Sequence, residues 1–196
     1  MELVKEIGKM KIDILGITET KRKGVGSQQK ADRYIMFWSG VDKSKTAQAG
    51  VAFVINKERI EILQVKNINE RIMVVKTKLG LEVYYFFVLY APNENAKVEE
   101  KEKFFKEIQQ EMDSVDNNNI IVMGDLNGRV GKDNCGMERW LGKEGEEMKN
   151  DNGKEYKNLV WKMTWWWQIQ SLLIKRFTKL LEKNLVGRKN LLLIIS

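Results

Sequence analysis

The chain has 196 residues, of which 43% are hydrophobic and 31% are charged, and its formal net charge is +7. This composition excludes an intrinsically disordered chain and an integral membrane protein, and the length suits one domain with a real core. The positive net charge favours a phosphate-rich partner, above all nucleic acid, although lysine-rich surfaces are often only exposed to solvent.

The cysteine content and the N-terminus indicate the compartment. A single cysteine, Cys135, excludes an intrachain disulfide and indicates a reducing environment. The N-terminal residues MELVKEIGKMK are charged throughout, unlike a signal peptide, and no apolar run approaches the ~20 residues of a membrane span. We therefore expect an intracellular protein, nuclear or cytoplasmic, without membrane association.

The first half of the chain is predicted to contain one helix followed by a series of strands. Apolar residues at helical spacing predict a helix over residues 2–11. Short apolar runs predict strands at residues 12–17, 34–38, 50–55, 60–65, 72–79 and 81–90, the last two joined at Gly80 as a hairpin. The polar segments 22–32 and 41–48 are expected to be loops.

The second half begins with the longest predicted helix, over residues 98–115, and a buried strand at residues 120–123. Residues 131–153 are polar and glycine-rich, which predicts a long loop. After about residue 156 the pattern changes: four tryptophans lie within seven positions, and the tail fits neither the helix nor the strand period well. This order of elements favours an α/β or α+β fold with helices outside mixed sheets.

Polar residues follow two of the predicted buried strands. Glu19 follows the strand at residues 12–17, and Asp125 and Asn127 follow the strand at 120–123. If both strands run in the same direction in one sheet, these side chains converge at one edge, where open α/β sheets place their chemistry. The segment Gly-Asp-Leu-Asn-Gly fits an Asx-stabilised turn equally well when taken alone.

Oxygen ligands without Cys or His select a hard cation such as Mg²⁺ or Mn²⁺. Such a metal stabilises charge on a phosphoryl oxygen and lowers the pKa of a bound water, from which Asp125 would take the proton. Tyr90, at the end of a third strand, would donate a hydrogen bond to the same phosphate. Taken alone, Tyr90 fits aromatic packing at a strand end better, and Lys21 fits an ordinary surface lysine better.

Four segments together resemble the endonuclease/exonuclease/phosphatase superfamily, and within it the endonucleases of LINE-type (non-LTR) retrotransposons and the craniofacial development protein-like sequences. They are IDILGITETK (12–21), GVAFVI (50–55), LYAPN (89–93) and IIVMGDLNGRVG (120–131), in family order over roughly residues 11–156. Each segment alone is weak evidence for the superfamily, whereas the four segments together are specific for it.

The resemblance implies an α+β fold: a four-layer α/β/β/α sandwich of the DNase I-like type, incomplete in this chain. It implies that Glu19 is the metal ligand and that Asp125 positions or deprotonates the attacking water. Asn127 would hold the phosphate or the nucleophile, and Tyr90 would contact the phosphate. The implied cofactor is Mg²⁺ or Mn²⁺, and the implied partner is DNA.

The sequence departs from the family at both ends. The family opens with a strand that carries an asparagine beside the metal, and this chain begins at the helix that follows, so we expect an N-terminal truncation. The family closes with a Ser-Asp-His element, whereas this chain contains no histidine. Histidine is the usual acid–base residue near neutral pH, so we expect very weak or no catalysis.

The codons permitted by the tail indicate a shifted reading frame. Read one nucleotide earlier, Met163 and Thr164 force Asp, and residues 165–168 then force Val, Val and Ala. Residues 169–170, 177–179 and 190–195 permit Asn-Thr, Ile-His-Lys and Ser-Ile-Ile-Asp-Tyr, a series that resembles the family's own continuation. We therefore expect a partial nuclease domain over 1–157 and a frame-shifted tail over 158–196; a divergent tail is the alternative.

Three functions remain open at this point. The first is a decayed Mg²⁺-dependent DNA endonuclease, a phosphodiesterase of retrotransposon origin. The second is a phosphatase of the same superfamily that acts on inositol phosphates or nucleotides, because the metal half-site would look the same. The third is a non-catalytic remnant that binds nucleic acid.

Overall fold

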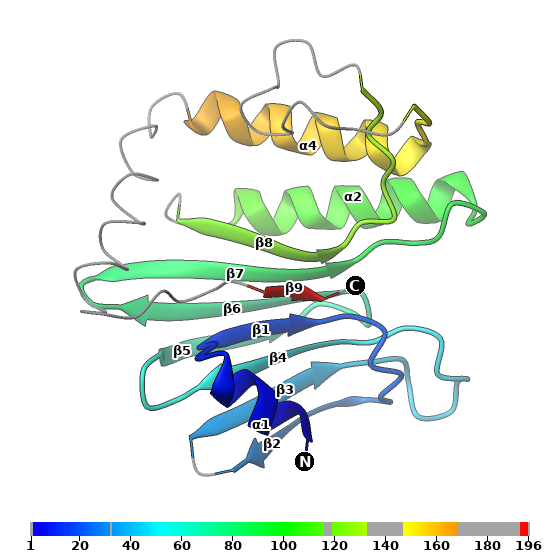
Figure 1. Ribbon diagram of the computed structural model, residues 1–196. Helices are drawn as coiled ribbons and strands as arrows, with labels where there is room; N and C mark the ends of the chain where they lie inside the picture. Colours follow the sequence, from blue (N-terminus) through cyan, green and yellow to red (C-terminus); the bar gives the residue numbers. More distant parts are fainter. Residues whose placement is uncertain (1, 32, 116–118, 133–146, 168–192, 196) are drawn as a thin grey trace. The chain divides into compact units, whose positions relative to one another are not determined.

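The computed structural model describes residues 2–31, 33–115, 119–132, 147–167 and 193–195 (Figure 1). The elements follow in the order α1 (Glu2–Lys9), β1 (Ile14–Ile17), β2 (Val25–Lys30), β3 (Tyr34–Ser39), β4 (Val51–Asn56), β5 (Glu61–Asn67), β6 (Ile72–Leu79), β7 (Glu82–Tyr90), α2 (Val98–Asp113), β8 (Ile120–Asp125), α4 (Asp151–Trp167) and β9 (Leu193–Ile195). None of the described helices is both long and apolar enough to cross a membrane.

The chain divides into two compact units. The first contains Met1–Tyr90, Asp116–Asp125 and Leu180–Ser196, and the second contains Ala91–Val115 and Leu126–Lys179. All the named strands belong to the first unit, in two sheets with the strand orders β2-β3-β4-β1-β9 and β5-β6-β7-β8. β1 is antiparallel to β4, whereas β7 and β8 are parallel.

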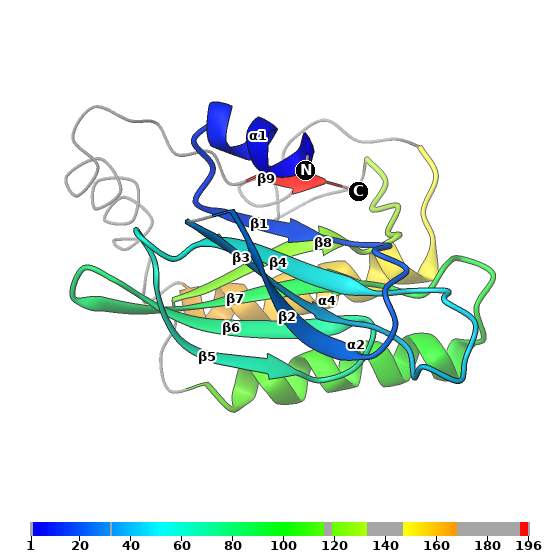
Figure 2. The ribbon, with the colours of Figure 1, turned by 90° about the horizontal axis from the view of Figure 1, so that it is seen from below.

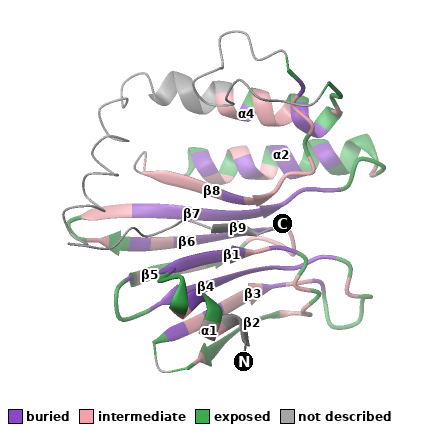
Figure 3. Cartoon of the chain, viewed as in Figure 1, coloured by how far each residue is buried: buried purple, intermediate pink, exposed green. Residues whose placement is uncertain are grey.

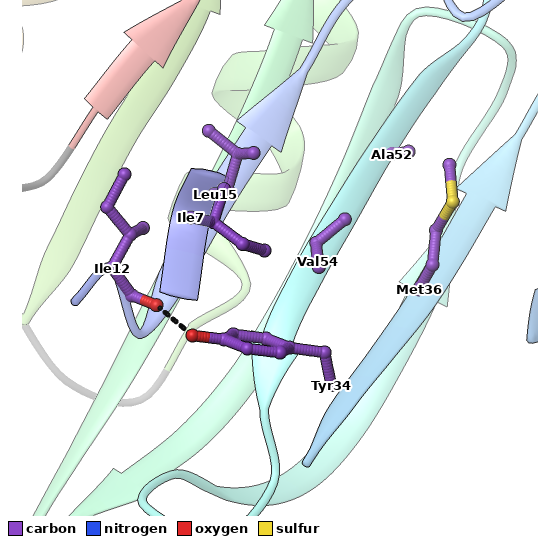
Figure 4. Packing of buried hydrophobic residues seen from close by; sticks show 7 residues of the cluster. All are labelled: Ile7, Ile12, Leu15, Tyr34, Met36, Ala52 and Val54. Carbon is purple, nitrogen blue, oxygen red and sulfur yellow. Dashed lines mark hydrogen bonds between the residues drawn. The ribbon is translucent and has the colours of Figure 1, made fainter. Parts of the chain in front are cut away.

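Helix α1 closes one face of the first sheet. Both ribbon views place it beside β1 (Figures 1 and 2). Ile7 of this helix is 1% exposed and packs with Leu15 and with apolar residues of β3 and β4 (Figure 4). The Tyr34 hydroxyl donates a hydrogen bond of 3.1 Å to the Ile12 carbonyl, which satisfies the polar end of a buried ring. The helix therefore fixes the segment that leads into β1.

The opposite face of the first sheet packs against the second sheet. β4 is buried along its whole length, as is β7 from Tyr84 to Tyr90 (Figure 3). At Gly16 of β1 the sheets approach so closely that a Cβ atom would lie 2.5 Å from Met123 Sδ and 3.2 Å from Val88 Cγ2. The absence of a side chain at Gly16 therefore allows β1 to lie against β7 and β8.

The second unit contains helices α2 and α4, which contact each other. α2 buries Phe104, Phe105, Ile108 and Met112 on one face, and α4 buries Leu159. Lys101 is also buried, and its ammonium donates 2.6 Å to the Glu94 carbonyl and lies 3.5 Å from Asp151 Oδ2. These partners offset the cost of removing the lysine charge from water.

Most of the predicted elements are confirmed. The helices α1 and α2 are present, and so are the strands β1, β3, β4, β5, β6, β7 and β8, with β6 at the predicted residues 72–79. The prediction that the strand at residues 120–123 is buried is wrong, because Met123 is the only buried residue of β8 and the others are half-buried. The predicted and observed elements differ mainly in their first and last residues. These terminal residues pair or fray according to contacts that local sequence does not encode.

Two predicted loops are wrong in part. Residues 25–30, expected in a loop, form β2, a polar edge strand that pairs along its length with β3. Main-chain pairing rather than an apolar face makes this strand, so the hydrophobic pattern does not reveal it. The loop expected over 131–153 ends early because α4 begins at Asp151 and continues past residue 156. The tail residues 168–192 lie outside the described part of the chain.

Gly124 provides a test of the strand pairing in the second sheet. It lies opposite Leu89 in the β7–β8 pair with φ +123, and a Cβ there would lie 2.0 Å from the Leu89 carbonyl oxygen. We expect Gly124→Ala to lower the free energy of unfolding by about 2 kcal/mol or more in urea denaturation.

The matched control is Gly8→Ala in α1. A Cβ at Gly8 meets no atom within 4 Å, so we expect this change to raise the free energy of unfolding by about 0.5–1 kcal/mol. Equal stabilities of the two variants would contradict the backbone path described for β8.

Candidate functional site

The turn after β1 holds Glu19 in an unusual backbone conformation. Glu19 and Lys21 both have φ +52, in the left-handed region that costs a non-glycine residue roughly 1–2 kcal/mol. The Thr20 amide donates 3.0 Å to the Gly50 carbonyl, and the Arg22 amide donates 3.4 Å to Thr20 Oγ1. These contacts with the start of β4 hold the strained turn, which presents an exposed Glu19 carboxylate.

Tyr90 joins the second sheet to this turn. It is the last residue of β7 and is 6% exposed, and its hydroxyl donates a hydrogen bond of 3.1 Å to Glu19 Oε1. Burial raises the pKa of Tyr90, and the hydrogen bond to Glu19 and the charge of that carboxylate raise it further. The phenol therefore stays protonated, and remains a hydrogen-bond donor, throughout the neutral range.

Asp125 completes a group of three in the first unit. It ends β8 and lies opposite Tyr90 in the parallel β7–β8 register. Its negative charge also contributes to the raised pKa of Tyr90, so the carboxylate lies near that hydroxyl. The expectation that the strands before Glu19 and Asp125 share one sheet is wrong: β1 and β8 belong to different sheets. The residues converge because the two sheets pack face to face.

Arg71 adds a cation that the sequence analysis did not identify. Its guanidinium lies 5.3 Å from the centre of the Tyr90 ring, and its Nη1 donates 3.3 Å to the Tyr90 carbonyl. The Asn69 side chain accepts a 2.7 Å bond from the Arg71 amide and so fixes the turn before β6. Arg71 lowers the pKa of Tyr90, against the other influences. An arginine directly before a buried strand was the only signal in the sequence.

Asn127 belongs to the second unit and is described within it. Its backbone has φ +47, and its Nδ2 donates 2.8 Å to the Ala91 carbonyl and 3.3 Å to Asn93 Oδ1. The side chain therefore links the two loops that carry the segments LYAPN and GDLNG. Asparagine tolerates the left-handed region better than most residues, which fits its occurrence here.

Two further asparagines hold the loop that contains Asn127. Asn150 Oδ1 accepts the Arg129 amide at 2.9 Å and the Gly153 amide at 2.8 Å, and its Nδ2 donates 2.9 Å to the Asn127 carbonyl. Asn152 is 1% exposed and donates 2.7 Å to the Pro92 carbonyl and 3.2 Å to the Leu126 carbonyl. Both lie within the loop predicted over residues 131–153, where asparagine is common, so no pattern in the sequence distinguishes them.

The donor chemistry of the first unit fits a hard cation. Glu19 and Asp125 provide carboxylate oxygens near Tyr90, and Mg²⁺ is commonly bound through one or two carboxylates with water and substrate oxygens. Within the described residues, no group of three or more His, Cys, Asp and Glu side chains gathers to form a closed metal cage. The arrangement therefore suits an open site that a substrate phosphate would complete.

Comparisons with known proteins place this geometry in context. No family model matches the chain. Craniofacial development protein 2 is 27% identical over 157 residues in Bos taurus and 26% identical over 157 residues in Tragulus javanicus. Both alignments cover 79% of this chain, but the chain spans only about a quarter of the length of these curated relatives, 26% in each case.

Among solved structures, the endonuclease domain of TRAS1, a telomere-specific non-LTR retrotransposon, aligns with a TM-score of 0.50 at 15% identity. The alignment covers 83% of this chain and 63% of that domain. The predicted α+β, DNase I-like fold is thereby confirmed. The chain resembles the endonuclease/exonuclease/phosphatase superfamily, and its likenesses include both the retrotransposon and the craniofacial development protein branches.

The surroundings of Tyr90 can be tested by titration. Glu19→Gln removes a charge that favours the protonated phenol, so we expect the pKa of Tyr90 to fall while burial keeps it above that of free tyrosine. Arg71→Gln removes a cation, so we expect the pKa of Tyr90 to rise further. Absorbance titration of each variant, minus the same variant carrying Tyr90→Phe, isolates this group.

The control for the titration is Glu61→Gln, an exposed position on β5. We expect it to leave the pKa of Tyr90 unchanged. If the Glu19 and Arg71 variants also left it unchanged, the contacts of the Tyr90 side chain would differ from those described.

The role of Asn150 is testable by hydrogen exchange. In Asn150→Ala the Arg129 and Gly153 amides lose their acceptor, so we expect both to exchange faster and the free energy of unfolding to fall by about 1–3 kcal/mol. Asn158→Ala is the control, because exposed Asn158 makes only a 3.5 Å bond to Glu155. Equal exchange rates in the two variants would refute the role of Asn150.

Proposed function

We propose that this chain is the partial domain of a Mg²⁺-dependent phosphodiesterase, a DNA endonuclease of retrotransposon origin whose activity is weak or lost. The observation that supports it best is the 3.1 Å hydrogen bond from Tyr90 to Glu19, with Asp125 opposite Tyr90 in the adjacent strand. A hydroxyl bonded to one carboxylate, with a second carboxylate on the paired residue of the next strand, is suited to a phosphate and its metal, since the metal offsets the repulsion between anions.

The proposed roles follow from the chemistry of each side chain. Glu19 holds the divalent cation. The Tyr90 hydroxyl, which donates its single proton to Glu19 Oε1 in this structure, turns to donate it to a non-bridging phosphate oxygen. Asp125 orients the attacking water and accepts its proton. Asn127 holds the phosphate or the nucleophile through its carboxamide. When bound, Mg²⁺ or Mn²⁺ would stabilise negative charge on the phosphoryl oxygens.

The proposed weakness of catalysis rests on the residue content of the chain. It contains no histidine, and none of the proposed roles supplies a proton to the leaving group. General acid–base catalysis typically contributes about 10²–10⁴-fold to a rate. Binding and positioning of the phosphate do not need that group. We therefore propose that the chain retains nucleic-acid binding although cleavage is weak or lost. A domain that binds nucleic acid without any catalysis is the second candidate.

The proposed domain division places the boundary after residue 157 and assigns residues 158–196 to a shifted reading frame. α4 runs through this boundary, but a helix forms from local sequence and packing whatever reading frame supplied the residues. We expect the coding DNA, read one nucleotide earlier after about residue 157, to give a continuous superfamily-like sequence with a histidine. Codons incompatible with that string would exclude the shift.

Plasmid nicking tests the proposed site. We expect slow nicking that requires Mg²⁺ and stops with EDTA, and a further loss of about 10²-fold or more in Asp125→Ala and in Glu19→Ala. Glu61→Ala, an exposed carboxylate on β5, is the matched control and should nick like the unchanged chain.

Three results would each contradict part of the proposal. Nicking that is unaffected by Asp125→Ala would exclude the site, and release of phosphate from inositol phosphates in preference to DNA nicking would favour a phosphatase. Rapid nicking that depends on Asp125 would retain the site but overturn the proposed loss of activity.

A further inference from the structure

A concentrated positive surface lies directly beside the Glu19 turn. It is formed by residues 19–24 and 40–48, which together carry five basic side chains, Lys21, Arg22, Lys23, Lys43 and Lys45, and two acidic ones. Their net charge of +3 is close to half of the +7 of the whole 196-residue chain. We call these five basic residues the basic platform.

The two segments of the platform are held together by main-chain contacts. The Gly24 amide donates 2.7 Å to the Val41 carbonyl, and the Gly40 amide donates 2.9 Å to the Gly24 carbonyl. A Cβ on Gly40 would lie 1.7 Å from the Arg22 carbonyl oxygen, so only glycine permits this approach. The platform is therefore a built surface and not a chance meeting of two independent loops.

Individual cations of the platform are also positioned. The Arg22 guanidinium lies 4.7 Å from the centre of the Trp38 ring, a cation–π contact that leaves its edge suited to bidentate binding of a phosphate. Lys23 Nζ donates 3.2 Å to the Lys43 carbonyl, which keeps its charge over the junction of the two segments. Lys21, Lys43 and Lys45 are exposed.

The nearby acids offset only part of this charge. Asp42 accepts bonds of 2.9 Å from the Ser44 amide and 2.6 Å from its hydroxyl, which lower its pKa, and the charges of Lys45 and Lys23 lower that pKa further. Glu19 faces the Tyr90 hydroxyl at 3.1 Å. The potential over the platform is therefore positive, and an anion would meet several cations on one rigid surface.

We propose that the basic platform binds the sugar–phosphate backbone of a nucleic-acid strand next to the phosphate held at Glu19 and Tyr90. This inference rests on the proposed function, which places a phosphate at Glu19. Lys21 lies only two residues from Glu19 in the chain, so the platform adjoins that phosphate. A strand with several phosphates can engage several cations of the platform at once, whereas a compact phosphate metabolite would leave most of them unused.

The test is binding of a fluorescent DNA duplex in EDTA, where cleavage cannot occur. The variant is the triple substitution Lys21→Gln, Lys43→Gln and Lys45→Gln. The control changes the same charge elsewhere in the first unit, with Lys11→Gln, Lys66→Gln and Lys78→Gln, all at exposed positions.

Each neutralised duplex phosphate contributes about 0.9 to the magnitude of the slope of log K against log salt. Over a tenfold change in salt concentration, this corresponds to about 8-fold in affinity for each phosphate. We expect the platform variant to lose a slope of about 2–3 and the control to lose less than about 1. Equal losses in the two triple variants would overturn the platform.

A second arm tests the class of partner. Polyglutamate carries negative charge without phosphate, and phosphatidylserine vesicles carry phosphodiesters without a sugar–phosphate backbone, so we expect both to compete poorly with DNA. Competition as strong as that of unlabelled DNA would overturn the assignment to nucleic acid. Because the binding is measured without metal, a failure of Mg²⁺-dependent nicking alone would count against the proposed function and not against the platform.

Discussion

The close approach of the two sheets at Gly16 is the contact on which the candidate site depends. A Cβ there would lie 2.5 Å from Met123 Sδ and 3.2 Å from Val88 Cγ2, so side chains between the sheets would have to shift. The hydrogen bond from Tyr90 to Glu19 is only 3.1 Å long and joins the end of β7 to the turn after β1. A separation of even an ångström would break it, since such bonds weaken steeply beyond normal distances. The packing of the core thus determines the geometry of the polar groups.

Backbone strain is concentrated in the turns that carry Glu19 and Asn127. Of the described non-glycine residues, those with positive φ are Lys11, Glu19, Lys21, Ala31 and Asn127. Three of these five lie in the two turns that carry the proposed ligands and phosphate contacts. Such conformations persist only where surrounding contacts over-determine them, and here those contacts are main-chain bonds to Gly50 and the asparagine side chains around Asn127.

The sequence predicts most strands, because their apolar patterns are strong. It places Glu19 and Asp125 after two of these strands and Tyr90 at the end of a third, but the convergence that it predicts for Glu19, Asp125 and Asn127 depends on a shared sheet. It does not predict β2, whose polar residues pair through the main chain, or the assignment of β1 and β8 to different sheets. Arg71, Asn150 and Asn152 also escape it. These residues act on backbone carbonyls and amides of distant segments, and no local pattern encodes such partners.

The contacts that hold the Glu19 turn and the basic platform lie within one part of the chain. The Glu19 turn is held by Gly50 and Tyr90, and the basic platform by Gly24 and Gly40, all within residues 19–90. None of these contacts involves a residue beyond 157. A change of sequence after residue 157 therefore leaves these contacts of the Glu19 turn and the platform in place.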